Sequence, residues 1–174
     1  MANTLHQANL TVSAEEDRLL LRLSTSKNQE YRFWLTRRFL RLLWSVLVKA
    51  AERVPGIGEQ SDESVRRALL SFQHDAAVQQ ADFKTAYKAD ALHTPFGSEP
   101  ALLTGAKLKT LRSGAIDLSL ETSDKRTLGI RLDAKLLHSL CSVLAAAANK
   151  AEWELDLKMG APLGSERVSG PIMH

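Results

Sequence analysis

Arginine and tryptophan are concentrated in one short stretch of the sequence, and these residue types are suited to binding anionic partners. Residues 31–41 hold no acidic side chain and contain Arg32, Trp34, Arg37, Arg38 and Arg41. Guanidinium groups bind phosphate or carboxylate oxygens in bidentate geometry, and an indole ring stacks on unpaired bases. Arg22, Arg32 and Trp34 are expected on the outward face of two predicted strands, and Arg37, Arg38 and Arg41 follow on the next predicted helix. One interpretation of this arrangement is a surface that binds single-stranded nucleic acid.

Two other interpretations of the same residues stay open. In the simpler one, Trp34 packs against another part of the chain and the arginines are ordinary surface charge. In the other, the cationic face is a docking site for an acidic protein. Arg37 and Arg38 fall in the first turn of a predicted helix, where the helix dipole disfavours cations. We therefore expect something acidic nearby, either a bound phosphate or a carboxylate of the chain itself.

The sequence contains none of the common catalytic or metal-binding motifs. GxGxxG, GxxxxGK[ST], HExxH, GxSxG and paired CxxC are all missing. The five histidines are scattered, with no spacing typical of metal ligands. His138 and Cys141 are three residues apart on a predicted helix, but no orienting group or oxyanion site accompanies them. We expect a non-catalytic protein with no metal site and no cofactor.

Composition and charge are those of an ordinary globular domain. The chain has 174 residues, of which 44% are apolar and 25% charged, and its formal net charge is +3. These values exclude a disordered chain, a collagen-like fibre and a disulfide scaffold. The charge excess is also smaller than is usual for a protein that coats duplex DNA.

The cysteine content and the distribution of apolar residues bear on the cellular compartment. Cys141 is the only cysteine, which excludes an internal disulfide and fits a reducing environment. Residues 1–11 lack the basic start and apolar core of a signal peptide, and the most apolar run, 39–48, is too short to span a bilayer. We expect a cytoplasmic protein that does not associate with membranes.

An internal repeat gives the clearest indication of how the chain is organised. Residues 21–50 align without a gap on residues 118–147, a shift of 97, and eleven of the thirty pairs are identical. Apolar residues alternate through two strands of each copy and then follow helical spacing. Thr36 and Asp133 stand at the change from strand to helix, where their side chains can cap the first turn. An additional strand is predicted before each copy, at 5–12 and 102–111.

These elements predict an α+β fold made of two β-β-β-α units related by a pseudo-twofold axis. Short links between strands favour antiparallel hairpins, and the helices are expected to cover one face of the sheet. We predict a single domain over 1–159 and a flexible tail over 160–174. Within the domain we expect repeat one at 4–54, a helical insert at 61–90, repeat two at 101–150 and a final strand at 152–158.

At the level of topology alone, a repeated antiparallel sheet followed by a helix is similar to single-strand-binding modules of the PUR-repeat and Whirly type. No binding motif of those families is present, so the likeness transfers no function. The first predicted helix is apolar around most of its circumference, through Leu42, Trp44 and Val48. This surplus favours a protein interface, and the sequence therefore predicts an interaction protein or structural subunit that self-associates or binds another protein. The single-stranded nucleic-acid module is the alternative.

Overall fold

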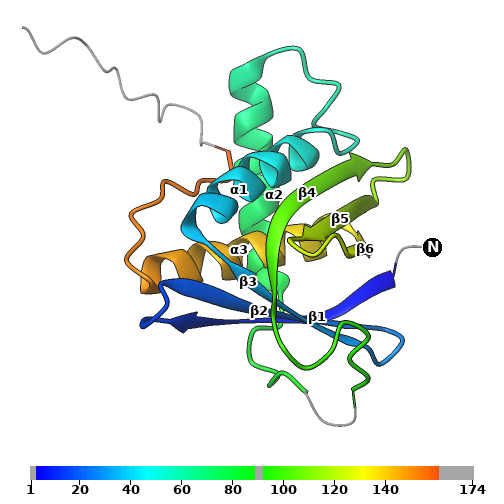
Figure 1. Cartoon of the computed structure of the whole chain (residues 1–174). Coiled ribbons are helices and arrows are strands. Elements are labelled where there is room, and N and C mark those ends of the chain that lie inside the picture. The colour runs from blue at the N-terminus through cyan, green and yellow to red at the C-terminus, as the bar shows by residue number, and fades with distance from the viewer. Residues whose placement is uncertain (1–2, 89–91, 161–174) are drawn as a thin grey trace, which may run out of the picture.

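The computed structural model describes residues 3–88 and 92–160, and these residues form six strands and three helices. The α+β class predicted from the sequence is confirmed. In chain order the elements are β1 (Asn3–Ser13), β2 (Arg18–Thr25), β3 (Glu30–Leu35), α1 (Arg37–Glu52), α2 (Glu63–Gln80), β4 (Ala101–Thr110), β5 (Ile116–Thr122), β6 (Thr127–Leu132) and α3 (Ala134–Lys150) (Figure 1).

The strands form two three-stranded antiparallel meanders, β1–β2–β3 and β4–β5–β6. In the first, Leu21 pairs with Phe33, and in the second Leu118 pairs with Ile130. Throughout β5, and in β2 up to Leu23, alternate residues are buried and their neighbours are half-buried, as the period-two pattern predicts. The buried set from both meanders forms one continuous apolar core.

Two short parallel pairings join the meanders into a closed barrel. Phe33 and Trp34 of β3 lie beside 101–102 of β4, and Asn3 and Thr4 of β1 lie beside 130–131 of β6. The prediction of a purely antiparallel sheet is therefore wrong at these two junctions. Parallel neighbours need a long connection, and α1, α2 and the following loop supply one between β3 and β4.

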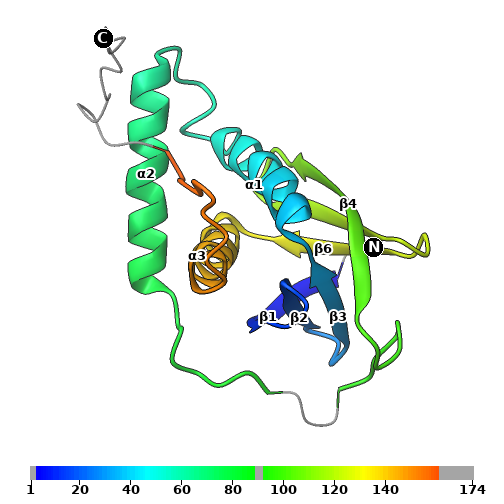
Figure 2. The same cartoon turned by 60° about the vertical axis from the view of Figure 1, so that its left-hand side comes forward.

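Helices α1 and α3 begin directly after the last strand of each meander and pack against the barrel. Thr36 accepts a hydrogen bond from the Phe39 amide, and Asp133 accepts one from the Leu136 amide, so both predicted caps are present. Helix α1 contacts β4, and α3 contacts β1. Figure 2 shows both helices on the same side of the strands.

Helix α2 forms the outermost layer, packed on α3 and α1 (Figure 2). It begins at Glu63, directly after its cap Asp62, and is a single continuous helix. It ends at Gln80, earlier than the predicted insert, so Phe83 and Tyr87 lie on a non-helical segment beyond it. Residues 89–91 of that insert are outside the described residues. None of the helices in 3–88 and 92–160 combines the length and apolarity that crossing a bilayer requires.

The predicted strand over 152–158 does not form, although the chain there has one buried face. Trp153 and Met159 are buried, but residues 153–160 join no sheet. Alternating apolar residues predict an extended segment with one buried face. The pattern does not by itself show that the segment pairs with a neighbouring strand. At Gly160 a Cβ would lie 2.4 Å from the Arg67 carbonyl oxygen of α2, so only glycine fits this close approach. The rest of the predicted tail lies outside the described residues.

Candidate functional site

The predicted Arg/Trp face lies on the outward side of β2 and β3, but Arg22 is engaged within the chain. Its Nη2 donates to Asn9 Oδ1 at 3.1 Å, and its guanidinium carbon lies 4.7 Å from the centre of the Tyr87 ring. Such a cation–π contact already uses the flat surface of the guanidinium group. Arg22 therefore holds the segment after α2 on the sheet and presents no open stacking surface.

Arg32 is held by a network around the buried carboxylate of Glu30. Its Nε donates to Glu30 Oε1 at 2.5 Å, and its Nη1 donates to the Ser98 carbonyl at 2.9 Å. The Tyr87 hydroxyl donates to Glu30 Oε2 at 2.9 Å. Burial, followed by the hydrogen bond and charge of Glu30, raises the pKa of Tyr87 well above its usual value. Residues Tyr87 and Ser98, from the segments on either side of residues 89–91, therefore cover this part of the face. Trp34 is half-buried, in register with Leu20 and Leu102.

The other three predicted arginines lie on α1 and are exposed. Arg38 and Arg41 share one exposed stripe of the helix with three further residues, Leu42, Ser45 and Lys49. Arg37 is exposed beside them. Within 3–88 and 92–160, none of the cations of α1 forms an ion pair, and the first turn of α1 has no acidic residue. The carboxylate partner expected from the sequence is thus not found among the described residues.

Strand β4, which packs beside α1, adds further positive charge. Lys107 and Lys109 are exposed, and β4 contains no acidic residue. The field of Lys109 acts on Asp117 of the neighbouring strand, although Arg131 is the main reason that the pKa of Asp117 is lowered. We call the exposed cations Arg37, Arg38, Arg41 and Lys49 of α1 the cationic surface.

The three predicted interface residues of α1 have different environments. Leu42 is 56% exposed and Val48 is half-buried. Trp44 is only 7% exposed, and its indole Nε1 donates to the Lys158 carbonyl at 3.3 Å. Trp44 is thus covered within the chain and is not exposed for contact with a partner. The Lys158 carbonyl belongs to the extended segment 153–160, so a later part of the chain covers Trp44, where the sequence favoured a protein interface.

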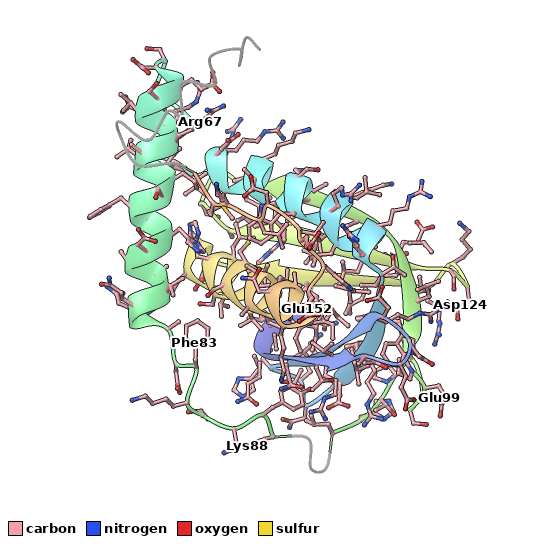
Figure 3. All side chains as sticks on the ribbon, turned by 90° about the vertical axis from the view of Figure 1, so that its left-hand side faces the viewer. Arg67, Phe83, Lys88, Glu99, Asp124 and Glu152 are labelled. Atoms are coloured by element: carbon pink, nitrogen blue, oxygen red, sulfur yellow. The ribbon has the colours of Figure 1, made fainter. Side chains whose placement is uncertain are left out.

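A groove of about 810 Å³ runs between β1, α3 and the segment that follows α2. Figure 3 shows Phe83 and Lys88 on this segment where it leaves the end of α2, and both line the groove. The Gln7 amide spans the gap: its Nε2 donates to the Ala86 carbonyl at 3.4 Å, and its Oε1 accepts from the Lys88 amide at 3.2 Å. Sequence reasoning missed this groove because its walls come from three separate segments.

A histidine pair between α2 and α3 is the second feature that sequence reasoning missed. The Nδ1 atoms of His74 and His138 are 3.0 Å apart although the residues are 64 positions apart in the chain. The ring nitrogen of His138 thus faces His74, and the thiol of Cys141 is fully buried, which raises its pKa to about 12. Across 3–88 and 92–160, no three His, Cys, Asp or Glu side chains are grouped to hold a metal ion. No sequence signal pointed to the pair, because each histidine stands alone on its helix.

Comparison of this chain with protein-family models, with curated proteins and with solved structures finds no match in any of the three.

Proposed function

We propose that this chain is a non-catalytic binding protein whose cationic surface binds a polyanion, with single-stranded nucleic acid as the partner. The observation that carries the proposal is the exposed stripe of α1, where Arg38, Arg41 and Lys49 have no ion-pair partner among the described residues. At 1.5 Å per residue, the stripe from 38 to 49 extends over about 16 Å. That is long enough for several successive phosphates to contact it.

Helix stability does not explain the arginines at the start of α1. Cations in the first turn oppose the helix dipole by some tenths of a kcal/mol, and acidic residues there would be favourable. Arg37 and Arg38 are found instead, with no acid in that turn. A bound anion would offset this cost, because the positive end of the dipole and both guanidinium groups would then act on the same negative charge.

The choice of nucleic acid over an acidic protein rests on Trp34. This half-buried ring stands three residues before Arg37, on the outward face of β3. An aromatic ring beside a row of cations is the arrangement by which single strands are bound with little sequence preference. Because Arg22 and Arg32 are engaged with Tyr87 and Glu30, the proposed contact uses Trp34 and α1 rather than the whole sheet face.

The test is a titration of a fluorescently labelled oligothymidylate at two salt concentrations, read by anisotropy. The double variant Arg38→Ala/Arg41→Ala should weaken binding, and it should reduce the slope of log affinity against log salt by about 1.4, which corresponds to two lost phosphate contacts. The matched control is Lys135→Ala/Lys150→Ala on α3, which removes the same charge from two exposed positions. Lys135 is offset from Arg38 by the repeat shift of 97.

Each result of this titration decides something. Loss in the first variant and near-normal binding in the control support the proposal. Equal losses in both variants would show that net charge alone attracts the oligonucleotide, and an absence of salt-dependent binding by the unmodified protein would remove the proposal. Binding of a labelled acidic peptide by a protein that does not bind the oligothymidylate would identify an acidic protein as the partner.

Self-association is the second candidate, and exposed apolar side chains favour it. Leu42 is 56% exposed on α1, and Phe72 is 71% exposed on α2. Isolated exposed apolar residues are common, so the test is the oligomeric state itself. We expect light scattering to detect a dimer at high concentration that Leu42→Ser weakens. A strict monomer under these conditions would leave no role for Leu42 in self-association.

We also propose that the two β-β-β-α units arose by internal duplication and are related by a pseudo-twofold axis. Their hairpins support this: Asn28 and Lys125, 97 positions apart, both adopt left-handed backbone with φ of 58° and 69°. The two parallel pairings also occur at corresponding positions of the units. Trp34 takes part in the pairing of β3 with β4, and Arg131, 97 positions later, takes part in the pairing of β6 with β1. An experimental structure in which 19–50 and 116–147 do not superimpose would overturn the proposal.

A further inference from the structure

The contact between α2 and α3 contains two imidazoles that face each other. His74 is half-buried on α2, and His138 on α3 is only 2% exposed. Their Nδ1 atoms are 3.0 Å apart, and their rings meet edge to face with centroids separated by 5.1 Å. The distance is that of a hydrogen bond between one protonated and one unprotonated ring nitrogen.

The hydrogen bond between the two Nδ1 atoms requires that only one of them carries a proton. When both rings are charged, both Nδ1 atoms are donors, so neither can accept the bond and two positive charges face each other. His138 is too deeply buried for water to solvate its charge. A second proton would therefore act against the contact between the two helices.

The groups around the pair offer little compensation for added charge. On α2, Asp75 is the neighbour whose charge favours protonated His74, but burial has the larger effect and lowers the pKa of His74. On α3, burial and then the charge of His74 lower the pKa of His138 to about 4. The nearest titratable groups along α3 are the neutral buried thiol of Cys141 and the cation Lys135. Helix α1, which also packs against α2 and α3, adds no carboxylate that acts on either ring.

We propose that His74 and His138 form an acid-sensitive latch that holds α2 against α3 at neutral pH and releases it on acidification. The consequence extends to the groove, because one of its walls begins where α2 ends. Gln80, Ala81 and Asp82 line the groove and lie less than three helical turns beyond His74. Displacement of α2 moves this wall away from β1 and α3 and opens the groove.

The direction of the pH dependence follows from the lowered pKa values. The pKa of His138 is lower when α2 is docked than when it is released, so the neutral ring stabilises docking. This stabilisation is fully present when the pH is above 6.5, the ordinary pKa of histidine. That stabilisation is lost as the pH falls from 6.5 towards about 4, the pKa of docked His138. Release is therefore expected in this acidic range, and α2 should remain docked at neutral and alkaline pH.

Hydrogen exchange followed by mass spectrometry tests the latch in the whole chain. The measured quantity is the protection of α2 amides relative to those of β2 and β3, so that the intrinsic effect of pH on exchange cancels. Between about pH 7.5 and about pH 5, this relative protection should fall at least tenfold, since each unit by which the pKa is lowered contributes a factor of about ten. In His138→Leu, which fills the site with an apolar side chain, it should stay constant.

Two further measurements keep the test decisive. His93→Gln, at an exposed position away from α2, is the matched control and should behave like the unmodified protein. If His138→Leu does not fold, NMR titration of labelled histidine rings in the unmodified chain replaces it, and two midpoints below 6.5 are expected. Relative protection of α2 that does not change with pH would overturn the latch. So would a pH response that persists unchanged in His138→Leu, or ordinary midpoints for both rings.

Discussion

Arg41 and His138 stand at positions offset by 97 on α1 and α3, yet one is exposed and the other is 2% exposed. The difference lies in what covers each helix. Helix α2 packs more extensively on α3 than on α1, and it buries His138 against His74. On α1 the extended segment 153–160 covers Trp44 and leaves the stripe of Arg38 and Arg41 open. Two units of the same form thus present different surfaces because later parts of the chain cover them unequally.

The interiors of the two units should respond alike to mutation, and this is the largest effect that we expect. Leu21 and Leu118, offset by 97, are each 3% exposed and belong to one core. Replacing either by alanine should lower the free energy of unfolding by about 3 kcal/mol, through lost apolar contact and the cavity left behind. Urea denaturation measures both, with Leu42→Ala on the surface as the control. A cost several-fold larger in one unit than in the other would show that the units do not share one interior equally.

The outer faces should respond differently, and Glu30 gives the next largest effect. Glu30→Ala leaves the Arg32 guanidinium and the Tyr87 hydroxyl without their shared partner, so we expect a loss of about 2 kcal/mol. The position offset by 97 is Thr127, which is exposed, and Thr127→Ala should change stability by less than about 0.5 kcal/mol. Thermal unfolding of both variants makes the comparison. Equal small losses would mean that Tyr87 and Ser98 are held on the sheet without the carboxylate.

Local patterns predicted the elements because they depend on neighbouring residues. Alternation along β2 and β5 and helical spacing in α1 and α3 identify which face is buried, and Thr36 and Asp133 satisfy amides only three residues away. The same patterns do not say what buries a face. They therefore predicted the class and the order of the elements from β1 to α3 correctly, added a final strand over 152–158 that does not form, and left the sheet open where the barrel closes.

The features that escaped prediction all join distant parts of the chain. Trp44 meets Lys158 across 114 positions, and His74 meets His138 across 64. Tyr87 covers Arg22 from a segment whose helical-looking spacing of aromatics suggested a continuation of α2. In each case the individual residue is unremarkable in its own segment, and only the tertiary arrangement gives it a partner. The predicted site arginines accordingly divided into two engaged residues on the sheet and three exposed ones on α1.

The caps of α1 and α3 should have smaller and similar effects. Thr36→Ala and Asp133→Ala each remove one hydrogen bond to an amide of the first turn, from Phe39 and from Leu136. We expect each variant to lose about 1 kcal/mol in chemical denaturation. Thr36→Ser and Asp133→Asn keep a capping oxygen and should retain most of that stability. If the alanine variants matched the unmodified protein, the packing of the helices on the barrel would suffice to position them.

The smallest effect is expected at a cross-strand pair where the two units differ in chemistry. Asp117 and Arg131 pair on the outer face of β5 and β6 through two hydrogen bonds of 2.7 and 3.0 Å, and the positions offset by 97 hold Leu20 and Trp34. Asp117→Ala should lower the melting temperature by no more than about 2 °C, and less in high salt, because the ion pair is exposed to solvent. Arg131 lowers the pKa of Asp117, so its contribution is present above pH 3.8 and is lost as the pH falls through the lowered value. Leu20→Ala should instead cost stability independently of salt. If the loss of stability in Leu20→Ala depended on salt, or the loss in Asp117→Ala did not, the two pairs would not differ as proposed, one being apolar and the other ionic.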